Sequence, residues 1–127
     1  MTKKRRKFVK DTIDHWRRRL FLCEWHLDVA YAKEDQDSEE RAAATCRANP
    51  VYMTAEITIY PCFWKHSEID QRHMLVHELC HCITQSIWNV AKSQHNGFLM
   101  SPHVVHDEIE MLTQRISSIA FQEEWKK

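Results

Sequence analysis

Residues 77–81 read His-Glu-Leu-Cys-His, and this segment constrains the chain more than any other. In an α-helix, residues i and i+4 lie on the same face one turn apart, so His77 and His81 can direct a ring nitrogen toward one cation. Glu78 lies about 100° around the helix from His77, beside that cation. The segment therefore has to be helical, and the side that holds the ion has to be packed inside the protein.

The residues around the two histidines are those of a half-buried helix. A divalent ion held there would lower the pKa of a bound water, and Glu78 could accept the proton. This pattern is typical of zinc hydrolases. The alternative is that the two histidines only occupy a half-buried helix and that Glu78 is exposed. The apolar residues of the expected helix are Leu75, Val76, Leu79, Cys80, Ile83 and Ile87.

Length and charge limit what can surround this helix. A chain of 127 residues with 43% hydrophobic content predicts a single domain spanning residues 1–127. Its formal net charge is zero, so no overall field draws it toward nucleic acid or a membrane, and we expect neither as a partner. The charge is nevertheless uneven: we expect residues 1–6 to form a basic tail and residues 35–40 an acidic loop.

The sequence also indicates a compartment. It contains no run of eighteen apolar residues, and its N-terminus lacks the apolar region of a secretory signal, so we expect a cytoplasmic protein. The cysteines are odd in number and scattered, which favours free thiols in a reducing environment. Cys80 is expected in the core, because adjacent helix residues diverge and cannot join His81 on one ion. The cysteines are Cys23, Cys46, Cys62, Cys80 and Cys82.

Hydrophobic periodicity predicts an α+β fold with a backing helix, a twisted three-stranded sheet that is antiparallel or mixed, the motif helix and a C-terminal helix. Ser67 is expected to cap the motif helix. The core stripe of the last helix is expected at residues 105, 109, 112, 116 and 119. The expected helices span 7–22, 67–88 and 104–124, the strands 25–31, 42–48 and 55–60, and a loop 89–102.

This order of elements, together with residues 77–81, resembles the minimal gluzincin-type zinc metallopeptidases that are often found in phage and prophage genomes. The resemblance covers most of the chain in element order. It implies a small zincin-like domain that binds Zn²⁺ through His77 and His81, with Glu78 as the general base. It also implies a third ligand, a glutamate from the following helix.

Two glutamates and one histidine compete for the role of third ligand. In the family, the ligand glutamate is followed by small residues three and seven positions later, because its helix packs tightly against the motif helix. Glu110 fits this pattern with Thr113 and Ser117, whereas Glu108 is followed by larger residues. We therefore rank Glu110 first and Glu108 second. His106 remains an alternative, with Glu110 as its hydrogen-bonding partner.

If the metal is present, the expected activity is hydrolysis of a peptide or protein substrate, with Glu78 passing the proton of water to the leaving amine. His95, His103 and His106 are candidates for stabilising the oxyanion. A substrate could add to an exposed edge strand at residues 42–48. The alternatives are a zinc hydrolase of a non-peptide amide, and a non-enzymatic module in which zinc is structural and the basic N-terminus contacts nucleic acid.

Overall fold

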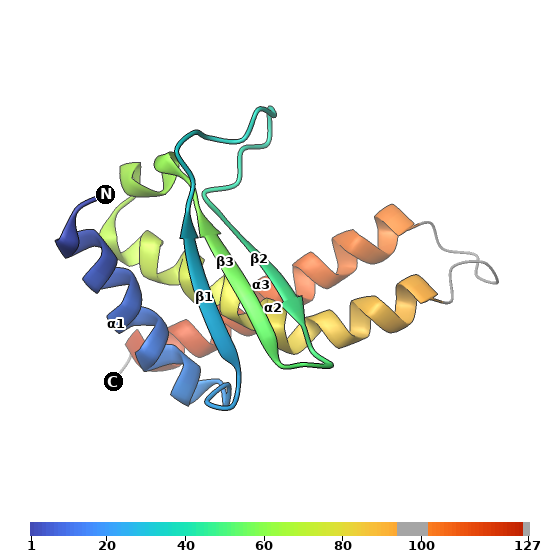
Figure 1. Cartoon of the computed structure of the whole chain (residues 1–127). Coiled ribbons are helices and arrows are strands. Elements are labelled where there is room, and N and C mark those ends of the chain that lie inside the picture. Colours follow the sequence, from blue (N-terminus) through green and yellow to red (C-terminus); the bar gives the residue numbers. More distant parts are fainter. Residues whose placement is uncertain (94–101, 126–127) are drawn as a thin grey trace.

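The computed structural model describes residues 1–93 and 102–125 (Figure 1). These residues form a small α+β protein with three α-helices and a three-stranded mixed sheet. No helix in these two ranges has the length and apolar content needed to cross a membrane. The elements are α1 (Lys3–Arg19), β1 (His26–Tyr31), β2 (Ala44–Asn49), β3 (Thr54–Ile59), the 3₁₀ helix η1 (Pro61–Lys65), α2 (Glu68–Ser93) and α3 (Pro102–Trp125).

The first helix begins earlier than predicted, so residues 3–6 of the expected basic tail are helical. Thr2 caps the helix, because its Oγ1 accepts a hydrogen bond from the Arg5 backbone N–H at 3.2 Å. The guanidinium of Arg5 lies 4.8 Å from the ring centre of Trp64, and that of Arg6 lies 5.5 Å from the ring centre of Tyr31. These cation–π contacts fix the first turn against η1 and β1.

The sheet has the strand order β1-β3-β2, with β3 parallel to β1 and antiparallel to β2. Side chains alternate along β3: Ala55, Ile57 and Ile59 are buried, whereas Glu56 is exposed. The helices lie on the buried face of the sheet, with α2 between the strands and α3 (Figure 1). Because β2 is an edge strand, only one of its sides is paired.

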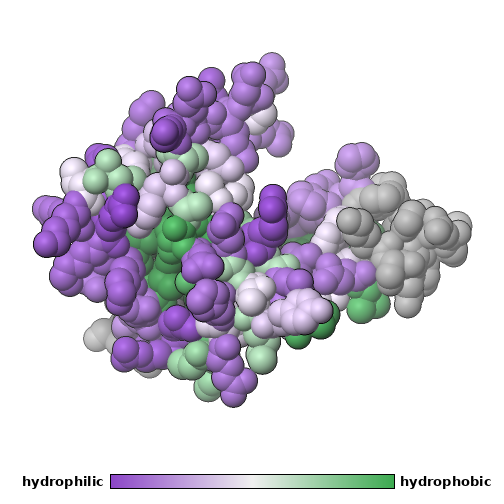
Figure 2. All heavy atoms as spheres, in the orientation of Figure 1, coloured by the Kyte–Doolittle hydropathy of each residue, from purple (hydrophilic) through white to green (hydrophobic). Residues whose placement is uncertain are grey.

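One core holds these layers together. It is built from α1, β3, η1 and the first half of α2, where the side chains of Val9, Ile57, Phe63 and Leu79 are fully buried. Hydrophobic side chains are visible between α1 and β1, and hydrophilic ones border them (Figure 2). The predicted burial of Cys80 is confirmed, because its side chain has no exposed surface.

The second half of α2 and the first half of α3 extend past the sheet as an arm (Figure 1). Helix α2 continues to Ser93, so residues 89–93 are helical and not part of the predicted loop. The rest of that loop, residues 94–101, lies outside the described residues. Ile83 and Ile87 are 40% and 51% exposed, whereas Thr84 between them is fully buried, so both isoleucines lie on a side of α2 that the core does not cover.

The prediction for the core stripe of α3 is wrong at two of its five positions. Leu112 is 38% exposed and Ile119 is 64% exposed. Among the side chains of α3 that the structure describes, those of Thr113 and Ser117 are fully buried. Small side chains let α3 approach α2 closely, and this contact takes the place of a wide apolar stripe.

Candidate metal-binding site

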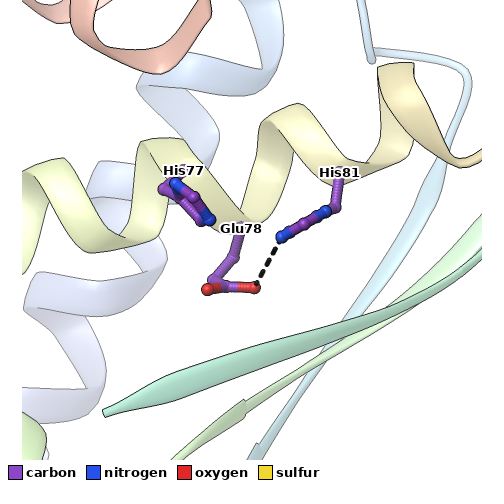
Figure 3. A group of neighbouring side chains, drawn as sticks. All are labelled: His77, Glu78 and His81. Atoms are coloured by element: carbon purple, nitrogen blue, oxygen red, sulfur yellow. Dashed lines mark ion pairs between the residues drawn. The ribbon is translucent and has the colours of Figure 1, made fainter. Parts of the chain in front are cut away.

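Helix α2 presents both motif histidines because its opposite side is anchored in the core. Leu75 and Leu79 have no exposed surface, and Ser67 caps the helix by accepting a hydrogen bond from the Asp70 backbone N–H at 3.2 Å. The capping prediction is therefore confirmed. The rings of His77 and His81 lie one turn apart with their centres separated by 5.0 Å. Both project from the same side of α2 as Glu78 (Figure 3).

Helix α3 brings a second carboxylate to the two imidazoles. Glu110 Oε2 lies 3.4 Å from His77 Nε2, and Glu110 Oε1 lies 3.3 Å from His81 Nε2. The approach of the two helices is fixed one turn away, where Thr113 Oγ1 and Thr84 Oγ1 share a hydrogen bond of 2.9 Å. Both threonines are fully buried, so this contact sets the separation of the helices beside the site.

The spacing of these atoms fits a metal ion. A tetrahedral ion with bonds of about 2.1 Å to nitrogen and oxygen keeps its ligand atoms about 3.4 Å apart. The two separations between Glu110 and the imidazoles match that value, and they exceed the usual length of about 2.8 Å for a charge-assisted hydrogen bond. His77, Glu78 and His81 also offer ligand atoms within 4.8 Å of one another, so this cluster can hold a metal ion.

Gln114, one turn after Glu110, orients the first histidine. Its Oε1 lies 2.7 Å from His77 Nδ1, and its Nε2 donates to Ser118 Oγ at 3.2 Å. With the amide oxygen accepting, the proton of His77 sits on Nδ1, and Nε2 keeps a lone pair directed at Glu110. Ligating histidines are commonly held by such a partner. This role for Gln114 was not predicted from the sequence. Its spacing of four residues from Glu110 could have indicated that both side chains lie on the same side of the helix.

Glu78 is the more buried of the two carboxyl groups, with 11% of its side chain exposed against 41% of the Glu110 side chain. Burial raises the pKa of Glu78 to about 8; nearby His77 acts in the opposite direction, and Glu110 adds to the rise. Glu78 Oε2 lies 3.9 Å from His81 Nε2, farther than either oxygen of Glu110 lies from its histidine (Figure 3). In the protein without a metal, this carboxyl group is poised to exchange a proton near neutral pH.

The pKa values of His77, Glu110 and His81 are also shifted, and each depends on the charges of its neighbours. Burial has the largest effect on His77 and lowers its pKa, but Glu110, Glu78 and Gln114 together outweigh it, so the pKa is raised. The contact with His77 is the main cause that lowers the pKa of Glu110. Burial lowers the pKa of His81, with Glu110 acting against it. A neutral His81 offers the lone pair that metal binding requires.

The site opens into a cleft of about 720 Å³. One wall is formed by residues 41–46, which are the start of β2 and the segment before it, and the other walls come from α2 and α3. Three consecutive alanines, at positions 42–44, line the first wall. The small side chains and the edge position of β2 leave room for an extended chain beside this strand.

The other histidines and glutamates predicted for the site lie in different places. His106 lines the cleft, with Nε2 at 4.0 Å from Glu110 Oε1 and its ring edge-to-face with Trp88. His103 is exposed and does not line the cleft. Glu108 is also exposed, on the side of α3 about 160° around the helix from Glu110. His95 lies outside the described residues.

Comparison of the chain with known protein families, with curated proteins and with solved structures found no match. The described residues form a small α+β protein with a cleft, in which His77, Glu78 and His81 could hold a metal ion and Glu110 lies beside the two histidines.

Proposed function

We propose that this protein is a zinc-dependent metallopeptidase of the gluzincin type with a zincin-like fold. The observation that carries the proposal is the position of Glu110, whose two oxygens lie at tetrahedral spacing from the Nε2 atoms of His77 and His81. Two imidazoles and one carboxylate form a set of three ligands that leaves the fourth position open, as in catalytic zinc sites. Gln114 supports this set by fixing the ring of His77.

In this proposal Glu78 is the general base and not a ligand. When bound, the zinc ion acidifies water and polarises the scissile carbonyl. Glu78 takes the proton of the attacking water and delivers it to the leaving amine. Burial raises the pKa of Glu78 to about 8 in the metal-free protein, and a bound cation would lower it, so the carboxyl group would be ionised and able to act as a base.

The substrate class follows from the wall opposite the helices. Residues 44–46 of the edge strand β2 line the cleft, so an extended peptide can pair with the backbone of this strand as an added strand. Alanines 42–44 limit side-chain interference along that wall. Of the predicted oxyanion donors within the described residues, His106 lines the same cleft and His103 does not, so we assign the role to His106.

The test is peptide cleavage by the zinc-loaded protein, followed by mass spectrometry on a mixture of unstructured peptides. Glu78→Gln should bind zinc as the wild type does and lose about 10²- to 10⁴-fold in rate. Glu110→Gln should lose zinc, whereas the matched variant Glu108→Gln should keep both zinc and activity. Cleavage by Glu78→Gln at the wild-type rate, or retention of zinc by Glu110→Gln with full affinity, would refute the assignment.

A further inference from the structure

The outer side of α3 carries a row of large apolar residues that the fold leaves exposed. The exposed fractions are 45% for Val104, 48% for Met111, 38% for Leu112 and 64% for Ile119. Helical geometry puts these positions about 100° to 180° around α3 from the buried Thr113, which contacts α2. The core contacts α3 through other positions, where Ile116, Ala120 and Phe121 pack against it.

Two charged residues complete the row. Glu108 lies between Val104 and Met111, and Arg115 lies between Leu112 and Ile119. Both are exposed, and neither forms an ion pair within the part of the chain that the structure describes. The six residues follow one another at three- or four-residue steps around the central pair, the spacing of a helix-packing stripe. We call residues 104, 108, 111, 112, 115 and 119 the α3 stripe.

The α3 stripe is complementary to itself. Reversing the helix end for end about the midpoint between Met111 and Leu112 brings position 104 onto 119 and position 108 onto 115. Apolar positions then meet apolar positions, and the glutamate meets the arginine. A two-fold axis requires this kind of match, because each contact occurs twice with the partners exchanged.

We propose that the α3 stripe joins two copies of this chain in a symmetric dimer in which the two α3 helices pack antiparallel. Met111 and Leu112 of both copies form the centre of the contact. Glu108 of each copy pairs with Arg115 of the other, so two ion pairs flank the centre. A stripe for an unrelated partner has no need of this symmetric order of apolar, acidic and basic positions.

The dimensions of the stripe set the strength of the contact. From residue 104 to residue 119 the helix rises about 22 Å, so the helix pair buries less surface than a standard interface of about 1,600 Å² and the dimer exchanges with monomer. Glu110 and Gln114 lie on another side of α3 and line the cleft. The dimer therefore leaves both clefts open, and the proposal does not depend on the metal.

Sedimentation of the full chain over a range of micromolar concentrations tests the proposal. The wild type should shift reversibly from monomer to dimer. Glu108→Arg and Arg115→Glu each place like charges together twice per dimer, and each should raise the dissociation constant about tenfold or more. The double variant Glu108→Arg/Arg115→Glu restores opposite charges and should restore the dimer. Leu112→Asp should abolish it.

Glu39→Arg is the matched control, because it makes the same change of charge in the loop between β1 and β2. It should leave the dimer unchanged, and circular dichroism should show equal helix content in all variants. A wild type that stays monomeric at every concentration overturns the proposal. This result would also be found if the α3 stripe bound a different protein and not a second copy of this chain. A double variant no better than the single variants also overturns it, because pairing between residues 108 and 115 would then be absent.

Discussion

Burial of the Glu78 carboxyl group should make the free energy of unfolding depend on pH, and Glu78→Gln should remove this dependence. In the metal-free folded protein burial raises the pKa of Glu78 to about 8, whereas the usual value for glutamate is 4.5. The folded state therefore holds this proton more tightly than the unfolded state does. The resulting stabilisation is complete below about pH 4.5 and is lost progressively as the pH rises to about 8.

The magnitude follows from the separation of the two pKa values. One pH unit corresponds to about 1.36 kcal/mol, so the free energy of unfolding should fall by as much as about 4 to 5 kcal/mol between the two ends of that interval. Glutamine has a similar shape and no charge to desolvate. The metal-free Glu78→Gln protein should therefore become more stable than the wild type as the pH rises, with the largest difference near pH 8.

Urea unfolding in the presence of a chelator, repeated at several pH values between about 5 and 8, measures this difference. Glu56→Gln is the matched control, because Glu56 is exposed on β3 and the same substitution there should leave the pH profile of the wild type intact. Parallel profiles for wild type and Glu78→Gln would refute the reasoning. Adding zinc should flatten the wild-type profile, since a nearby cation favours the ionised carboxylate.

Three further outcomes are expected. Elemental analysis of the purified protein should find one zinc per chain, and His81→Ala should lose it; equal zinc in both proteins would place the metal elsewhere. Gln114→Leu removes the partner of His77 Nδ1 and should weaken zinc binding about 10- to 100-fold in calorimetric titrations, with urea unfolding of the metal-free protein little changed. Thr113→Leu overfills the fully buried contact with Thr84 and should lower the free energy of unfolding by about 1 to 3 kcal/mol; an unchanged urea midpoint would show that α3 can move away without cost.

The parts of the fold that depend on local sequence were predictable. Three strands and three helices lie close to their predicted positions, because hydrophobic periodicity is a local signal. The proximity of His77 to His81 follows from helix geometry alone. The position of Glu110 near both histidines was also predictable, because Thr113 and Ser117 are small enough for close helix packing. In the structure both small residues are fully buried. The roles of these residues in metal binding stay predictions.

Features that depend on packing between distant segments were not predictable in the same way. The parallel pairing of β1 with β3 leaves no mark on either strand's pattern. The exposure of Leu112 and Ile119 depends on how α3 is turned toward α2, and the apolar spacing extended the buried side too far around the helix. The first turn of α1 was assigned to a tail because its positive charges oppose the helix dipole, a cost that the contacts of Arg5 and Arg6 offset.

The strand order has a consequence for how the chain reaches this structure. Strands β2 and β3 are joined by a short turn in which Met53 adopts a φ of 51°, so they can zip together as a local hairpin within microseconds. The only neighbour of β1 in the sheet is β3, so pairing of these two strands closes a loop of residues 32–53. We therefore expect the β2–β3 hairpin to form before β1 docks on it, because the loop closure makes the parallel pairing entropically more costly.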